Sequence, residues 1–86
     1  MKVVWSSEAR ADLHRIQAYL NDLSPRGTNR IWLRIVQRIA DQATMPLAAP
    51  LEREGPLRRL VITRTPYVVF YRVEDDKLLV EAVRSE

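Results

Sequence analysis

The sequence predicts a small α+β domain in which a helical hairpin packs on one face of a small antiparallel sheet. Three observations predict this class: apolar residues at helical spacing in the first half, β-prone runs in the last third, and a proline-containing stretch between them. The 86 residues suffice for one thin core, so we expect residues 1–86 to form a single domain.

The N-terminal part predicts a short strand followed by a helix. Residues 2–5 are β-prone, and Ser6 is the expected N-cap, because its hydroxyl can accept an amide proton from the first helical turn. Apolar residues then recur at spacings of four and three, which predicts a helix over residues 7–22. They are Ala9, Leu13, Ile16, Leu20 and Leu23.

A second helix is predicted after a turn at residues 24–28, which contain a proline and a glycine. Apolar residues from Ile31 to Ala43 again follow helical spacing, so we expect a helix over residues 28–44. The short connection makes the two helices antiparallel neighbours. The expected core residues of this hairpin are Leu13, Ile16, Leu20, Ile35 and Ile39.

Three strands are predicted in the last third, at residues 57–63, 67–73 and 78–84, after a loop at residues 45–56. Short turns join them into an antiparallel meander, and the full order is β-α-α-β-β-β.

Both faces of the middle strand carry apolar side chains, because Val68 and Phe70 alternate with Val69 and Tyr71. Only one face can pack on the helices. We therefore expect an exposed patch of Val68, Phe70 and Val83, covered either by a partner or by the loop at residues 45–56.

Composition narrows the classes of function. The absence of cysteine excludes disulfides and thiolate chemistry and indicates a reducing compartment. No apolar run approaches the roughly 20 residues needed to cross a bilayer, so we expect a cytoplasmic protein with no membrane association. Without a histidine-carboxylate cluster at ligand spacing or a glycine-rich phosphate loop, we expect no metal, no cofactor and no small-molecule substrate.

The net charge of +3 predicts an acidic partner, and arginine carries most of the positive charge because Lys2 and Lys77 are the only lysines. Two groups of arginines are candidates for binding. Arg26, Arg30, Arg34 and Arg38 recur every fourth residue along one side of the second helix, where they could meet DNA, RNA or an acidic protein, or could simply face solvent.

The second group is predicted on the sheet and comprises Arg58, Arg59, Arg72 and Arg84. Together these guanidinium groups could bind phosphate or carboxylate. The alternative is that each forms a solvated ion pair with Glu52, Glu54, Glu74 or Glu81.

Two segments resemble the RelE/ParE toxin superfamily, and its ParE-like (plasmid stabilisation) branch in particular. Residues 5–20, WSSEARADLHRIQAYL, are similar to the start of ParE toxins, where a strand leads into a helix with an Ala-x-x-Asp-Leu-x-x-Ile-x-x-Tyr pattern. Residues 56–60, PLRRL, and 66–73, PYVVFYRV, resemble the second signature, an Arg-x-Leu strand followed by a Tyr-x-Val-x-Tyr-x-Val strand. The two matches frame nearly the whole chain.

The resemblance implies the toxin of a type II toxin-antitoxin system, held in a hetero-oligomer by a ParD-like antitoxin. ParE toxins poison DNA gyrase, whereas RelE toxins cleave messenger RNA in the ribosome. We expect a gyrase inhibitor, with a ribosome-dependent endonuclease or a non-toxic antitoxin-binding relative as the alternatives. We assign target binding to the sheet arginines and antitoxin binding to Val68, Phe70, Arg30, Arg34 and Arg38.

No catalytic residue is predicted. The only histidine, His14, lies on the first helix, and the last strand contains neither tyrosine nor histidine. Ser85 stands where many family members have a histidine followed by a basic tail. We therefore expect a toxin that acts by binding and not as an enzyme.

Overall fold

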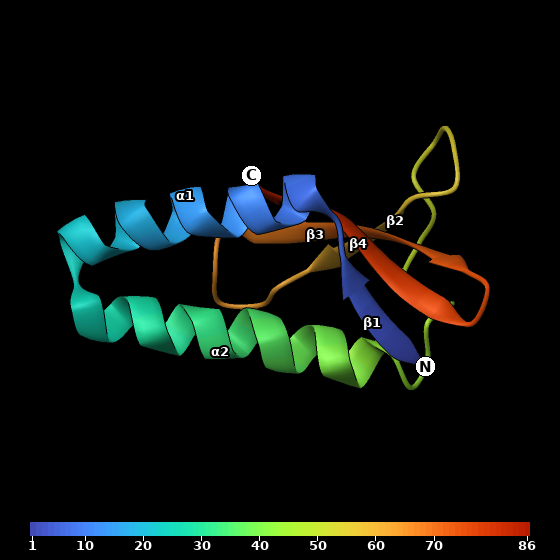
Figure 1. The fold of residues 1–86 in the computed structure, drawn as a ribbon, viewed down its shortest axis with the longest axis horizontal. Coiled ribbons are helices and arrows are strands. Elements are labelled where there is room, and N and C mark those ends of the chain that lie inside the picture. Colours follow the sequence, from blue (N-terminus) through green and yellow to red (C-terminus); the bar gives the residue numbers. More distant parts are fainter.

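A computed structural model describes the backbone of residues 1–86 and all side chains except those of residues 25 and 28. The elements follow the predicted order (Figure 1). They are β1 (Lys2–Trp5), α1 (Ser7–Leu23), α2 (Pro25–Gln42), β2 (Arg58–Val61), β3 (Tyr67–Glu74) and β4 (Lys77–Ser85). Of the described helices, neither is long and apolar enough to cross a membrane.

Helix α1 begins where the sequence predicts. The Ser6 hydroxyl accepts a hydrogen bond from the Ala9 amide at 3.0 Å, and Glu8 lies in the first turn, where its charge complements the helix dipole. Ser6 also joins the helix to the sheet, because its hydroxyl donates to the Glu81 carbonyl and its amide donates to the Val80 carbonyl. The end of β1 and the start of α1 are thereby held against β4.

Helix α2 begins three residues before the predicted start and ends two residues before the predicted end. The expected turn at residues 24–28 is instead the helix start, because Ser24 accepts a hydrogen bond from the Gly27 amide and Pro25 occupies the first turn. Serine and proline favour both turns and helix N-termini, which explains why the prediction was wrong here. The connection between the helices projects beyond the sheet (Figure 1), and Tyr19 and Leu23 are exposed at this end.

The sheet has the strand order β1-β4-β3-β2 and is mixed. Strands β2, β3 and β4 form the predicted antiparallel meander, whereas β1 pairs in parallel with the first half of β4. The β3-β4 hairpin closes through Asp75 and Asp76, which both have positive φ as a two-residue primed turn requires. Because β1 covers only residues 77–80, the outer edge of residues 81–85 is left without a strand.

A β-bulge in β4 changes which face its last residues occupy. Tyr71 pairs with Val80 and Phe70 pairs with Ala82, so Glu81 is an additional residue of β4. Beyond the bulge Val83 therefore faces the helices and belongs to the core. The predicted position of Val83 in an exposed patch is wrong for this reason.

The core lies between the helical hairpin and the inner face of the sheet. Leu13, Ile35 and Ile39 are buried as predicted, whereas Ile16 and Leu20 are half-buried and pack against the core from the projecting part of α1. The sheet and the residue that follows β2 contribute most of the remaining apolar side chains, which are Leu60, Ile62, Tyr67, Val69, Tyr71, Leu78, Val80 and Val83. The hairpin thus covers one face, as predicted.

Candidate interaction surfaces

An apolar groove of about 260 Å³ lies between α1 and α2 and reaches the end of β1. Its lining includes buried Leu13, half-buried Trp5 and Trp32, and Val36, whose side chain is 37% exposed. Trp5 reaches the groove because it is the last residue of β1, and Trp32 and Val36 are one turn apart on α2. Exposed apolar surface of this kind on a small protein is typical of a protein-binding site.

Two exposed polar residues of α1, Arg10 and His14, complete the lining of this groove. They lie one helical turn apart, so their side chains share one face of α1. The groove therefore combines an apolar floor with a cationic group at its border. The only histidine of the sequence thus belongs to this groove and lies on a helix rather than on the sheet.

Three of the four sheet arginines share the outer face, the one turned away from the helices. Cross-strand pairs place Arg59 beside Phe70 and Arg84 beside Val68, and Arg72 follows Phe70 by two residues on β3. Arg58 is different, because it pairs with Tyr71 on the inner side and donates to the carbonyls of Leu47 and Ala49 at 3.2 and 2.8 Å. The four guanidinium groups therefore do not form a single patch on the outer face, because Arg58 lies apart from the other three.

Each outer-face arginine is paired with acidic side chains. Arg59 pairs with Glu86 and lies 3.9 Å from Glu52, and its guanidinium lies 5.8 Å from the centre of the Phe70 ring. Arg72 pairs with Glu74 and approaches Glu81 at 3.5 Å. The predicted solvated ion pairs are present for these two residues, with Glu86 as an additional partner.

The predicted exposed patch on this face is wrong. Val68 is only 1% exposed, and Phe70 is half-buried beneath the Arg59 guanidinium. The loop at residues 45–56 runs along the β2 edge, where Leu51 forms a bridge with Arg58 and Glu52 lies 3.9 Å from Arg59. Charged side chains that pair with one another occupy the outer face instead.

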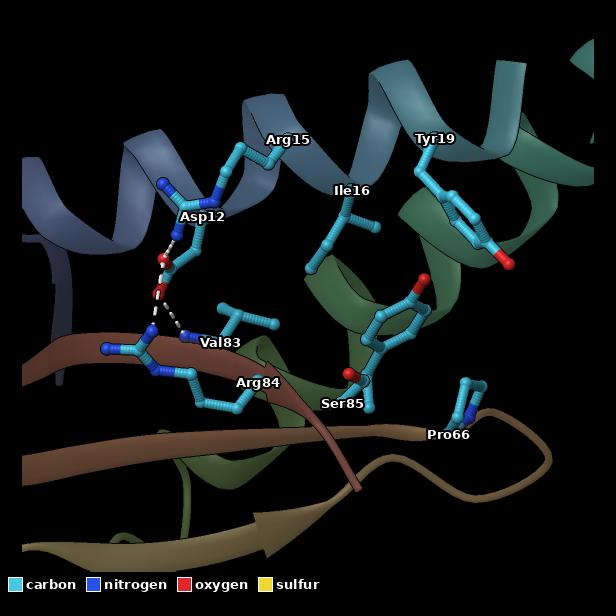
Figure 2. A pocket seen from close by; sticks show the side chains of 9 residues that line it. Asp12, Arg15, Ile16, Tyr19, Pro66, Val83, Arg84 and Ser85 are labelled. Atoms are coloured by element: carbon cyan, nitrogen blue, oxygen red, sulfur yellow. Dashed lines mark hydrogen bonds and ion pairs between the residues drawn. The ribbon is translucent and has the colours of Figure 1, made fainter. Parts of the chain in front are cut away.

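A buried carboxylate organises the contact between α1 and the free edge of β4 (Figure 2). Asp12 is 2% exposed, and its Oδ2 accepts a hydrogen bond from the Val83 amide at 2.9 Å. Its Oδ1 pairs with Arg15 and lies 3.8 Å from Arg84, which also approaches Glu8 at 3.3 Å. Asp12 thus satisfies an edge amide that no strand covers, and it holds Arg84 in place.

The same region contains an open pocket of about 440 Å³ between α1 and the end of β4 (Figure 2). Tyr19 from α1 and Tyr67 from β3 line it together with Pro66 and Ser85. Burial raises the pKa of the Tyr67 phenol above its ordinary value, and the neighbouring Tyr19 phenol raises it further. Two phenols and two arginines meet here, but both arginines are bound to Asp12.

Tyr71 is fully buried and has a structural role. Its hydroxyl accepts a hydrogen bond from Gln42 Nε2 at 2.9 Å and donates to the Pro46 carbonyl at 2.6 Å. These bonds join β3 to the end of α2 and to the following loop. A phenol held in this way supports the fold and is closed to substrate.

The arginines of α2 form a different arrangement. Arg30, Arg34 and Arg38 line an open depression of about 430 Å³ together with Leu33, Gln37, Asp41 and, from the turn after β2, Thr63. This depression shares no residue with the apolar groove. Helix α2 therefore presents two separate surfaces, an apolar one towards α1 and a basic one towards the β2 end of the sheet.

Sequence reasoning missed two features of these surfaces. One is the groove itself, since Trp5 and Trp32 pack against the core but also line an open surface, because a helical hairpin leaves part of its seam uncovered. Asp12 was noted only within a motif, although its spacing of three residues from Ala9 and four from Ile16 places it on the buried side of α1. A carboxylate on that side signals a buried partner.

Two comparisons of sequence relate this chain to known proteins. The profile of a family described as ParE toxin of type II toxin-antitoxin system, parDE, matches residues 3–86. A protein of Caulobacter vibrioides named Toxin RelE2 is 34% identical over 83 residues, which are 96% of this chain and 92% of the relative.

Solved structures show the same fold. A chain of the chromosomal ParDE toxin-antitoxin system from P. aeruginosa superimposes with a TM-score of 0.87 at 20% identity, covering 99% of this chain and 95% of the other. A chain of the toxin-antitoxin complex RelBE2 from Mycobacterium tuberculosis gives a TM-score of 0.65 at 23% identity, covering 99% and 96%.

Proposed function

The chain belongs to the ParE toxin family of type II toxin-antitoxin systems, and from this membership we propose that it inhibits DNA gyrase by binding and is neutralised by a ParD-like antitoxin. The observation that carries the proposal of a binding toxin is the apolar groove between α1 and α2, a surface suited to another protein. The proposal has two parts, the antitoxin and the target, and each has its own test.

The groove fits an amphipathic helix of the antitoxin. Trp5, Trp32 and Val36 would receive its apolar side chains, and Arg10 at the border would pair with an acidic one. Aromatic side chains in partly buried pockets are the residues that contribute most to protein interfaces. The structural relatives described above come from toxin-antitoxin complexes, which supports an antitoxin as the occupant.

A matched pair of substitutions on α2 tests this site. Val36→Asp places a charge in the groove, whereas Leu33→Asp places the same charge on the basic side of the helix, at a residue that is 50% exposed. We expect Val36→Asp to weaken antitoxin binding by about 30-fold or more, as loss of a central interface contact does. Leu33→Asp should change it less than about threefold. Equal losses, measured by calorimetry, would contradict docking in the groove.

Action by binding is supported by the positions of the side chains that could transfer protons. Tyr71 holds two structural hydrogen bonds in the core, and His14 lines the groove, whose lining contains none of the outer-face arginines. The outer-face arginines that could hold a phosphate are already paired with carboxylates. The target surface we propose therefore consists of Arg59, Arg72 and Arg84, which can exchange these partners for acidic groups of gyrase.

The competing function is ribosome-dependent cleavage of messenger RNA. It is supported by the similarity to the relative named Toxin RelE2. One purified preparation decides between them. We expect it to inhibit supercoiling by gyrase and to accumulate cleaved plasmid DNA, while messenger RNA on ribosomes stays intact. Cleavage of that RNA, abolished by one substitution of Tyr67 or Arg84 that leaves the protein folded, would establish an endonuclease instead.

A further inference from the structure

The basic surface of α2, to which antitoxin binding was assigned from the sequence, lies outside the groove and the outer-face arginines that carry the function proposed above. We define the α2 arginine stripe as Arg26, Arg30, Arg34 and Arg38. Its members recur every fourth residue on one side of α2, and three of them line the open depression that Thr63 closes on the sheet side. Arg26 and Arg30 are exposed, and Arg34 and Arg38 are half-buried.

The stripe carries unneutralised charge. Among the side chains that the structure describes, none forms an ion pair or hydrogen bond with any of the four guanidinium groups. Of the 14 basic residues, the ten outside the stripe are outnumbered by the 11 acidic residues of the chain. The net positive charge of the protein is therefore concentrated on this side of α2.

The spacing of the stripe matches a polyanion. Arg30 to Arg38 span about 12 Å along the helix axis, at a rise of about 1.5 Å per residue. One strand of duplex DNA presents a phosphate about every 3.4 Å of axis, so about three or four phosphates lie within this length. Guanidinium groups bind phosphate oxygens in a bidentate manner, and a rigid helix holds them in line.

The lining of the depression indicates the kind of nucleic acid. It contains arginine, glutamine, threonine, one aspartate and one leucine, and no aromatic side chain among its described residues. Proteins that hold single strands stack the bases on aromatic rings, whereas a duplex offers its phosphates without unstacking. We propose that the α2 arginine stripe binds the phosphate backbone of duplex DNA independently of base sequence.

The stripe and the groove lie on different sides of α2, so this surface stays accessible when the groove is occupied. Asp41 marks its end, because a carboxylate at the last turn of α2 repels a phosphate. The contact thus extends from Arg26 to Arg38. A toxin with its groove filled would still be attracted to DNA.

A charge-matched pair of variants tests the proposal. Arg34→Glu/Arg38→Glu and Lys2→Glu/Arg53→Glu each change the net charge by the same amount, but only the first alters the stripe, and neither touches the groove. Binding of the purified chain to a fluorescein-labelled mixed-sequence duplex is followed by anisotropy at several salt concentrations. We expect log K to fall with log salt with a slope of about −3, because about three phosphates are neutralised.

The stripe variant should lose at least about tenfold in affinity and about two units of that slope, whereas the control should lose less than about threefold. Circular dichroism checks folding. The single variants Arg30→Gln and Arg34→Gln remove one charge without reversing it, and each should bind the duplex more weakly than the parent chain but more tightly than the double stripe variant. Equal losses in both double variants would overturn the proposal, as would tighter binding of single-stranded DNA or duplex RNA. So would a stripe variant that keeps its DNA affinity and loses the antitoxin. Changes in DNA affinity alone do not bear on the groove or on gyrase, whereas loss of the antitoxin by the stripe variant would also contradict docking in the groove.

Discussion

The outer-face arginines and the α2 arginine stripe consist of the same residue type but differ in what surrounds them. Arg59, Arg72 and Arg84 each have at least two carboxylates within ion-pair distance. The stripe has none among the described side chains, and its members are neighbours of like charge. The sheet supplies acidic partners from distant parts of the chain, as Glu86 does for Arg59, whereas the helix repeats one charge along one side.

This difference teaches that a count of arginines does not identify a binding surface. A paired arginine must exchange one carboxylate for another when it binds, so most of its interaction energy cancels. An unpaired arginine gains the whole contact and releases counterions. The stripe is therefore the stronger candidate for a polyanion, and the outer face is the stronger candidate for selective contact with a protein.

The largest effect is expected at Asp12, the buried acid that holds Arg84 among the paired arginines. Asp12→Ala leaves the Val83 amide without an acceptor, and we expect the free energy of unfolding to fall by about 2 to 3 kcal/mol. Asp12→Asn retains an acceptor and should lose about 1 kcal/mol. Denaturation in urea measures both. A loss below about 1 kcal/mol for Asp12→Ala would show that the Asp12 carboxylate is not needed as the acceptor of the Val83 amide.

The same substitution in the two regions should act with opposite sign. Arg59→Gln removes the pairs with Glu52 and Glu86 and should lower the free energy of unfolding by up to about 1 kcal/mol. Arg34→Gln removes repulsion from Arg30 and Arg38 and should raise it by about 0.5 to 1 kcal/mol at low salt. Both differences should shrink in 1 M salt, where the screening length is short. If both variants were destabilised, Arg34 would form a stabilising ion pair or hydrogen bond of its own, and the contrast between the two arginine groups would fail.

The smallest effect is expected at alkaline pH. The pKa of Tyr67 is raised in the folded protein, so its contribution to stability is complete below the ordinary phenol pKa of about 10 and is lost as the pH rises through the higher folded value. Tyr67→Phe should therefore lose less stability between pH 9 and 11 than the parent chain. Arginine stays charged in this range, so the contrast between the two arginine groups should persist. Parallel stability profiles for the two proteins would exclude this role of Tyr67.

Local features of the fold were predictable because their causes are local. The N-cap at Ser6, the stripe of apolar residues along α1 and the alternation in β3 each depend on residues a few positions apart. The start of α2 was predicted three residues late, because Ser24 and Pro25 suit a turn and a helix start equally. The arginine stripe was also predictable, since helical periodicity alone aligns residues four apart.

By itself, the sequence determined the order of elements, the helical hairpin and the positions of the arginines along each element. Only the tertiary structure decided that β1 pairs in parallel with β4, that the bulge at Glu81 turns Val83 inward, and that Arg59 pairs with Glu86 while Arg34 forms no ion pair with any described side chain. Each of these outcomes depends on groups brought together across long stretches of chain, and their pairing follows from how the strands and helices pack. The exposed patch expected around Val68 failed for this reason, because burial is a property of the assembled surface and not of alternation along one strand.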